Sequence, residues 1–223
     1  MPASEDHAGL LETGARTLGC ALDAQQVAKA LDFRSLLLKW NRVHNLTAIR
    51  DPGQALTHHL LDSLAVVAPL RRQLQGRPGA RLLDVGSGGG LPGVMLAIAW
   101  PELRVTCVDA VAKKAGFLRQ AAAELGLTNL DAVHSRVERL DAPTFDVVAS
   151  RAFASLADFT RLTGRHLAAD GVWMAMKGQQ PGGEIAALPA DIDVFHVEPL
   201  SVPGLDAERC IVWMGLKGAK PST

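Results

Sequence analysis

RLLDVGSGGGLPG, at residues 81–93, is an apolar run that breaks into glycines. Four of the five residues at 86–90 are glycine, and Pro92 follows shortly after them. Glycine lets the chain reverse sharply from a strand into a helix, and its bare backbone can close on a ligand. Pro92 fits the first turn of that helix, where its missing N–H is not needed. The stretch predicts a strand, a nucleotide-binding turn and a helix.

Two cofactors compete for this turn. Gly88, Gly90 and Gly93 satisfy G-x-G-x-x-G, the dinucleotide fingerprint that holds the pyrophosphate of NAD. The wider pattern at 83–90, hydrophobic-Asp-hydrophobic-Gly-x-Gly-x-Gly, resembles motif I of the Rossmann-like S-adenosylmethionine (SAM) methyltransferases. Asp84 in that pattern suits a cofactor that carries an ammonium and a sulfonium cation, whereas it would repel a pyrophosphate. The turn therefore favours SAM over NAD.

Length and composition predict an ordinary globular chain. The 223 residues can bury a full core as one domain with a small extension. No apolar run is long enough to span a bilayer, and the N-terminal MPASEDHAGL is acidic and polar, unlike a signal peptide. The three cysteines are far apart, which argues against a disulfide framework and against a zinc site. We therefore expect a soluble, cytoplasmic protein with neither a membrane nor a metal partner.

The net charge of zero hides an uneven distribution along the chain. Residues 34–81 carry eight basic and two acidic side chains, a local net charge of +6. Such a stretch can bind phosphates, because neutralising them releases counterions wherever the remaining charge lies. It can equally be the solvated face of a helix. Charge density alone leaves both interpretations open.

Hydrophobic periodicity and turn residues predict helices first and then alternating strands and helices. The predicted helices are 23–40, 54–74, 92–100, 112–125 and 156–167. The predicted strands are 81–85, 104–109, 131–134, 145–149 and 171–176, followed by a hairpin of 194–197 and 210–216. This order indicates an α/β fold, a doubly wound Rossmann-like SAM-methyltransferase sheet with an N-terminal helical extension. We expect a basic, substrate-facing helical part at 1–76 and a SAM-binding core at 77–223, in one compact unit.

Ligands of such sheets lie over the carboxyl ends of the strands. Asp109 ends the second strand, where an acid would bind the ribose hydroxyls of either NAD or SAM. Val137 and Glu138 follow the third strand, where methyltransferases commonly place the adenine, although Glu138 is equally compatible with a surface charge. Arg151 follows the fourth strand, the usual place for residues that face the reacting atom.

The residues after the fourth strand narrow the reaction. Methylation of an exocyclic amine usually requires an Asn/Asp-Pro-Pro-aromatic loop there, and methylation of a pyrimidine C5 requires a cysteine nucleophile. The sequence SRAFASL at 150–156 contains neither. An arginine suits an acceptor with an available lone pair, because the transfer then needs alignment rather than a base. Guanine N7 is such an acceptor, and arginine donors read the O6 and N7 edge of guanine.

From Lys39 to Leu216 the chain resembles a known family. It carries KWNRVHNLTAIRDP, HHLLDSL, LLDVGSGGGLPG, KKAGFLRQ, SRVERL, FDVVASRAFASL, MKGQQP and LDAERCIV in order. These motifs resemble the bacterial 16S ribosomal RNA guanine-N7 methyltransferases (RsmG, or glucose-inhibited division protein B). SRAFASL, and NLTAIRD together with HHLLDSL, are not general methyltransferase motifs, so the match is specific.

The resemblance implies a cofactor and a substrate. SAM would be the cofactor, and the substrate would be guanine 527 of the 530 loop in 16S rRNA, presented as naked RNA, the 30S subunit or an assembly intermediate. With the strand-end residues, the expected cofactor-binding set is Asp84, Gly86, Gly88, Gly90, Leu91, Asp109, Val137, Glu138 and Arg151. Arg151 is also the expected catalytic residue.

The resemblance further implies residues that hold the RNA phosphates and the guanine edge. These are Asn45, Arg50, His58, His59, Arg136, Lys177 and Arg209. A structural role competes with each assignment: Asn45 can simply close a turn, His58 can pack a helix and Lys177 can end a strand. A histidine is not required as a base, because guanine N7 has no proton to remove.

Two other functions stay open at this stage. One is an NAD-dependent oxidoreductase, which the glycine fingerprint alone permits. The other is an RNA-binding protein that retains a vestigial SAM pocket without catalysis. Binding of SAM rather than NADH separates the first from a methyltransferase, and a methyl-transfer assay separates the second.

Overall fold

The chain folds around one seven-stranded sheet, which confirms the predicted α/β class. The computed structural model describes residues 6–75, 77, 79–151, 153–179 and 181–218. Five strands are parallel neighbours, namely β1 (Arg81–Val85), β2 (Arg104–Asp109), β3 (Leu130–His134), β4 (Phe145–Ser150) and β5 (Leu167–Lys177). The order is β3-β2-β1-β4-β5-β7-β6, in which β7 (Arg209–Leu216) pairs antiparallel with both β5 and β6 (Ile192–Leu200). This is the doubly wound sheet that the alternating pattern predicts, closed by the predicted hairpin.

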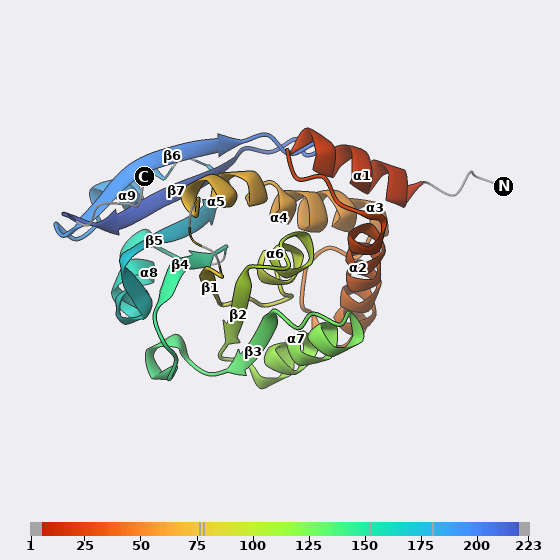
Figure 1. Ribbon diagram of the computed structural model, residues 1–223, viewed down its shortest axis with the longest axis horizontal. Coiled ribbons are helices and arrows are strands. Elements are labelled where there is room, and N and C mark those ends of the chain that lie inside the picture. Colours follow the sequence, from red (N-terminus) through yellow and green to blue (C-terminus); the bar gives the residue numbers. More distant parts are fainter. Residues whose placement is uncertain (1–5, 76, 78, 152, 180, 219–223) are drawn as a thin grey trace.

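Helices flank the sheet on both faces. On one side lie α1 (His7–Thr17), α2 (Ala24–His44), α3 (Pro52–Ala55), η1 (Leu56–Leu61), α4 (Asp62–Leu64), α5 (Val67–Gln73), α6 (Gly93–Ala99) and α7 (Ala112–Glu124). The other side carries the 3-10 turn η2 (Val137–Arg139), α8 (Leu156–Thr163), the 3-10 turn η3 (Gly164–His166) and α9 (Gly182–Ala186). Figure 1 shows α2, α4 and α5 on the same side of the sheet as α6, and α8 on the opposite side.

Local signals fix most of these boundaries. Asp23 and Gln26 form a reciprocal capping box at the start of α2. Asp51 accepts the backbone N–H of Gln54 at the start of α3, where Pro52 occupies the first turn. Asn45 ends α2 with a left-handed backbone, φ 49°, a conformation that asparagine tolerates better than most residues. Asn45 therefore closes the end of α2, and Asp51 with Pro52 starts the next helix.

Other predictions need correction. The single helix predicted at 54–74 is instead a run of short pieces, in which η1 is a π-helical segment of six residues. A π-helical segment carries an extra residue per turn, which periodicity analysis at 3.6 residues does not detect. The helix predicted at 156–167 ends as α8 at Thr163, and β5 begins at Leu167. Gly76, the last residue of the predicted N-terminal part, and Pro78, at the start of the predicted core, lie outside the described residues.

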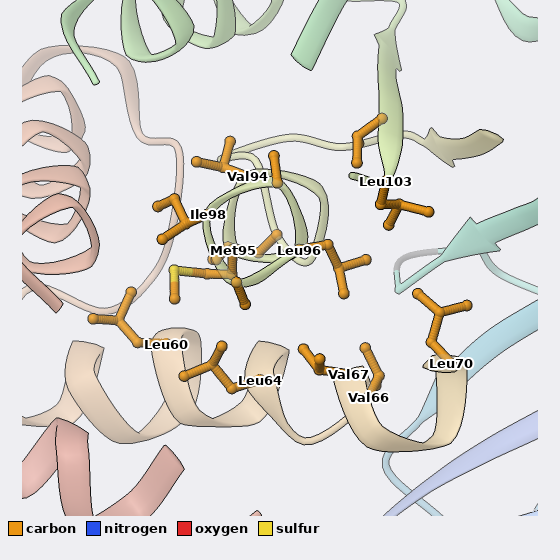
Figure 2. Close-up of a cluster of buried hydrophobic side chains, with 14 of the residues drawn as sticks. Leu60, Leu64, Val66, Val67, Leu70, Val94, Met95, Leu96, Ile98 and Leu103 are labelled. Atoms are coloured by element: carbon orange, nitrogen blue, oxygen red, sulfur yellow. The ribbon is translucent and has the colours of Figure 1, made fainter. Parts of the chain in front are cut away.

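Strand alternation divides the interior into two cores. On β1, Leu82 packs into the core on the α6 side, whereas Leu83 packs into the core that contains Phe159 of α8. Figure 2 shows the first core, where side chains of η1, α4 and α5 face those of α6. Figure 2 labels Leu60, Leu64, Val66, Val67 and Leu70 from the segment 60–70, Val94, Met95, Leu96 and Ile98 from α6, and Leu103, which follows α6. The N-terminal helices therefore share a core with the sheet and its helices.

We expect the N-terminal part and the sheet part to unfold as one cooperative unit. Leu64→Ala removes a fully buried side chain at the contact between them and should lower the free energy of unfolding by about 2–5 kcal/mol. Urea unfolding followed by circular dichroism and tryptophan fluorescence should show a single coincident transition. Val43→Ala, at a side chain that is 74% exposed, is the control and should stay within about 0.5 kcal/mol of the wild type. Two separate transitions would refute the single unit.

Candidate active site

The glycine turn between β1 and α6 contains glycines with two different roles. Gly86 has φ 69°, and a Cβ built on it would meet no atom within 4 Å, so its backbone borders open space. Gly90 has φ 83°, and a Cβ there would lie 2.6 Å from Cγ2 of Val94. Gly86 therefore leaves room for a ligand, whereas Gly90 allows the turn to pack onto the protein.

Asp84 lies beneath this turn and is nearly inaccessible, with 1% of its surface exposed. Its Oδ2 accepts a hydrogen bond from the backbone N–H of Gly93 at 3.1 Å. Among the described residues its Oδ1 has no hydrogen-bond partner. Burial raises the pKa of Asp84 to about 6, and the positive charge of Arg151 acts in the opposite direction. The site thus holds a carboxylate whose charge is poorly compensated, which a nearby cation would stabilise.

Asp109 ends β2 next to the turn, as predicted. Its Oδ2 accepts the backbone N–H of Gly88 at 2.9 Å, and its Oδ1 accepts that of Val111 at 2.8 Å. Each carboxylate oxygen has a second lone pair, so the group can still accept bonds from a ligand hydroxyl. The Asp109–Gly88 bond fixes the glycine turn against the end of the neighbouring strand.

The residues after β3 lie in the 3-10 turn η2. Val137 is buried, and its carbonyl accepts a hydrogen bond from Nε2 of His166 at 2.8 Å. Glu138 and Arg136 are exposed. The backbone carbonyl of Glu138 accepts from the Arg165 guanidinium at 3.1 Å. These bonds hold η2 in place while the Glu138 side chain stays accessible. Leu91, in the glycine turn, is buried.

A cleft of about 420 Å³ lies where the N-terminal helices meet the ends of β4, β5 and β7. We call it the Arg151 cleft. It is lined by Thr47, Ala48, Ile49, His58, His59, Asp62, Arg151, Met176, Lys177, Gly178 and Arg209. Five residues predicted to contact RNA or to catalyse, namely His58, His59, Arg151, Lys177 and Arg209, are therefore brought together. Asn45, Arg50 and Arg136 lie outside this lining.

Two arginines of the Arg151 cleft share one carboxylate. Asp62 Oδ1 accepts from Nε of Arg209 at 2.8 Å, and Asp62 Oδ2 accepts from Nη1 of Arg151 at 3.4 Å. The Asp62 side chain is 3% exposed, whereas that of Arg151 is 30% exposed. The carboxylate thus lies at the base of the cleft and the guanidinium of Arg151 reaches its surface.

His59 supports the wall of the cleft. Its Nδ1 donates to the carbonyl of His58 at 3.0 Å, so its Nε2 accepts from the hydroxyl of Thr47 at 2.7 Å. Burial, with a contribution from the Arg151 charge, lowers the pKa of His59 to about 4. The ring is therefore neutral near pH 7 and has no free N–H for a phosphate, so this geometry does not support the RNA contact predicted for His59.

The loop at 45–50 is held in place by Asn41 and Thr47. The Asn41 side chain donates to the carbonyl of Ile49 at 3.0 Å and accepts from the backbone N–H of Thr47 at 2.9 Å. The Thr47 hydroxyl accepts from the backbone N–H of Ile49 at 3.1 Å. Sequence reasoning missed Asn41, Thr47 and Asp62 as site residues, although the motifs NLTAIRD and HHLLDSL contain the last two.

Lys177 and much of the basic segment have partners within the protein. Lys177 Nζ lies 2.9 Å from a carboxylate oxygen of Glu184. In the segment 34–81, partners are found for Arg34 (carbonyl of Pro52), Arg71 (carbonyl of Ala99), Arg72 (Glu198), Arg77 (Asp146 and Asp170) and Arg81 (the Phe145 ring). Five of the eight basic side chains in the segment therefore have a partner within the protein. Arg42 and Arg50 are exposed and flank a smaller pocket of about 220 Å³.

The part of the chain that the structure describes lacks the features of a metal site and of a membrane span. It contains no group of three or more His, Cys, Asp or Glu side chains placed to hold a metal ion. None of its helices combines the length and apolar character needed to cross a bilayer.

Comparison with known proteins gives a consistent picture. A protein-family model described as "rRNA small subunit methyltransferase G" matches residues 26–212. Ribosomal RNA small subunit methyltransferase G of Acidovorax sp. (strain JS42) is 62% identical over 218 residues, which is 95% of each chain. The protein of the same name from Methylibium petroleiphilum is 64% identical over 208 residues, 93% of this chain and 94% of that one.

Solved structures with a similar fold are more distant in sequence. A SAM-dependent methyltransferase from Aquifex aeolicus aligns with TM-score 0.55 and 18% identity, over 81% of this chain and 97% of that one. TrmN from Thermus thermophilus aligns with TM-score 0.54 and 21% identity, over 72% and 53% of the two chains. At these identities the likeness establishes the fold alone, and it confirms the predicted Rossmann-like methyltransferase sheet.

The raised pKa of Asp84 predicts an unusual pH dependence of stability. The folded state keeps the proton of Asp84 up to about pH 6, whereas the unfolded chain releases it near pH 4. The contribution of Asp84 to stability is therefore complete below pH 4. As the pH rises from 4 towards 6, the free energy of unfolding falls by roughly 3 kcal/mol. Asp84→Asn should remove this loss, so the variant should gain stability relative to the wild type between pH 4 and 7.

Urea unfolding at a series of pH values measures this difference. Asp131→Asn, at an exposed carboxylate on β3, is the matched control and should not reproduce the effect. A stability difference between Asp84→Asn and the wild type that stays constant from pH 4 to 7 would contradict the raised pKa of Asp84 in the folded protein.

Proposed function

The chain belongs to the rRNA small subunit methyltransferase G family, and from that premise we propose that it transfers the methyl group of SAM to N7 of a guanine in the 530 loop of 16S rRNA. The observation that carries the proposal is the position of Arg151. Its charge acts on Asp84 under the glycine turn, and its guanidinium bonds Asp62 in the Arg151 cleft. One side chain therefore connects the proposed cofactor side with the proposed substrate side. A ribosomal RNA substrate implies that this reaction takes place in the cytoplasm.

The glycine turn fits SAM. The open space at Gly86 allows a ligand to approach the backbone, and the undercompensated carboxylate of Asp84 favours a cationic one. When bound, SAM supplies a methyl group made electrophilic by its sulfonium. We assign Gly86 and Gly88 as the positions where SAM comes close to the backbone. Asp109 is assigned as the residue that binds the ribose hydroxyls of SAM. Gly90 and Leu91 shape the turn from within, and Val137 and Glu138 form the adenine side.

The Arg151 cleft fits a guanine that reacts through a lone pair. Arg151 offers donors for O6, on the guanine edge that arginine typically reads, and so orients the base while the lone pair of N7 stays free for the methyl group. Transfer to N7 requires alignment of the guanine lone pair rather than removal of a proton. The state of His59 agrees with this, because its Nε2 already accepts from Thr47 and its Nδ1–H is donated to His58. His59 therefore supports the cleft instead of acting as a base.

The RNA backbone is proposed to follow the basic residues around the cleft. Arg209, His58 and Lys177 line it, while Asn45, Arg50 and Arg136 lie on exposed turns outside it. Exposed arginines near a cleft can neutralise phosphates without reading sequence. Arg42, beside Arg50 at the smaller pocket, extends this set.

The purified protein tests this function directly. It would be incubated with SAM and with naked 16S rRNA, 30S subunits or 30S assembly intermediates from a strain that lacks the gene, and 7-methylguanosine would be mapped in the RNA. Methylation at the 530-loop guanine is the expected result. RNA and SAM binding without methyl transfer would instead indicate a non-catalytic RNA-binding protein, and binding of NADH in place of SAM would indicate an oxidoreductase.

Arg151 should be essential for methyl transfer. Arg151→Ala should lower the single-turnover rate by about 10²-fold or more at saturating SAM, the scale expected for one positioned donor. Arg151→Lys should recover little of this loss, because an ammonium cannot present the fixed, planar donors with which a guanidinium would orient O6 of the guanine. The wild-type rate should be flat between about pH 6 and 8. A wild-type rate for the alanine variant would refute the role of Arg151, and a tenfold rise per pH unit through a histidine-like pKa would refute alignment without a base.

The exposed arginines of the N-terminal part should bind RNA phosphates. Reversing both charges with Arg42→Glu and Arg50→Glu should weaken RNA binding and reduce the slope of log K against log salt by about one to two units. The affinity for SAM should not change. Arg16→Glu with Arg104→Glu makes the same charge change at exposed residues of α1 and the amino end of β2, and serves as the control. Equal salt slopes for the two double variants would show that Arg42 and Arg50 are only solvated surface.

A further inference from the structure

We propose that Asp62 is a positioning residue for methyl transfer, which holds the guanidinium groups of Arg151 and Arg209 at a fixed spacing in the Arg151 cleft. The inference rests on the function proposed above and adds a residue that the sequence analysis did not select. Asp62 begins α4, directly after the π-helical segment η1. Its two arginine partners come from the end of β4 and the start of β7.

The burial of Asp62 makes its ion pairs obligatory. The side chain is 3% exposed, and a buried carboxylate is costly unless it is paired and hydrogen-bonded. Each oxygen of Asp62 serves a different arginine, at 2.8 Å and 3.4 Å. The carboxylate therefore cannot turn without losing one partner, which fixes both arginines relative to α4.

The arrangement leaves donors free for a substrate. Arg209 uses Nε for Asp62 and Nη1 for the carbonyl of Glu208, whereas Arg151 uses Nη1 for Asp62. A guanidinium carries five N–H donors, so both groups retain donors for other partners. Anchoring through Asp62 orders these long side chains before the substrate arrives, so less of their rotamer entropy is lost on binding.

Asp62 also sets the charge of the cleft. It compensates one of the two positive charges of the arginine pair. This compensation suits the reaction, because the methyl group leaves a cationic sulfonium and the product guanine is itself a cation. Replacing the carboxylate by an amide would leave two uncompensated arginines, which would attract RNA phosphates at least as strongly as in the wild type.

The effects of removing the Asp62 charge on the methylation rate and on RNA affinity distinguish a positioning role from a role in RNA binding. Asp62→Asn should lower the single-turnover methylation rate by about 10²-fold at saturating SAM and RNA, while RNA affinity stays equal or increases. The affinity for SAM should stay within about threefold of the wild type. Asp62→Glu keeps the charge but lengthens the side chain by one methylene, so its rate should lie between those of the wild type and the amide variant.

A matched control tests for a merely structural effect. Asp146, near the amino end of β4, pairs with Arg77 at 3.3 Å and accepts the backbone N–H of Arg81 at 2.8 Å. Asp146→Asn weakens another carboxylate–arginine pair, at the opposite end of that strand and with a carboxylate that is 26% exposed. It should lower stability in urea unfolding without changing the methylation rate by more than about threefold.

The outcomes are distinct. A rate of Asp62→Asn within threefold of the wild type, or a loss of RNA affinity in proportion to the rate, would overturn the positioning role. A parallel loss of rate in Asp146→Asn would show that the effect follows stability. If Asp62→Asn does not fold, Asp62→Glu decides, and a wild-type rate in that variant would overturn the proposal. A wild type that does not methylate 16S rRNA would refute the proposed function, and the inference with it.

Discussion

The parallel pairing of β1 with β2 on one side and with β4 on the other is the constraint on which the site depends. In this register Asp84 lies opposite Cys107 of β2 and opposite Ala149 of β4. The carboxyl ends of the three strands are therefore level, and the residues that follow them meet at one edge of the sheet. The glycine turn, Asp109 and Arg151 come together for this reason, although more than sixty residues separate the first from the last.

Buried carboxylates organise that edge in three different ways. Asp109 is satisfied by two backbone N–H groups and fixes the glycine turn. Asp62 is satisfied by two arginines and fixes their spacing. Asp84 has an oxygen that receives no hydrogen bond from the described residues, and its pKa is raised, so we expect it to reduce the stability of the folded protein above about pH 4. A group that lowers stability in this way is typical of a functional site, because a cationic ligand would relieve the cost.

The N-terminal helices complete the site and are part of the same core. They contribute the 45–50 loop, η1 and Asp62 to the Arg151 cleft, and their apolar side chains pack against α6. The network of Asn41, Thr47 and His59 turns this loop into a wall of defined shape. A change in the packing of these helices should therefore alter the geometry of the Arg151 cleft as well as the stability of the protein.

The sequence by itself determined the elements whose signals are local. The strands at 81–85 and 104–109 were predicted with the boundaries that the structure shows, because apolar runs and glycine turns fix backbone conformation over a few residues. The same signals placed Asp109 and Arg151 at strand ends. Only the tertiary structure decided which charges are free and which are paired. Asp62 meets partners 89 and 147 residues away, and Arg77 meets Asp170 at a separation of 93. Such pairs depend on how the layers pack, which no local pattern encodes. For the same reason charge density left the +6 segment open between phosphate binding and a solvated helix face, whereas the structure gives five of its eight basic side chains a partner within the protein.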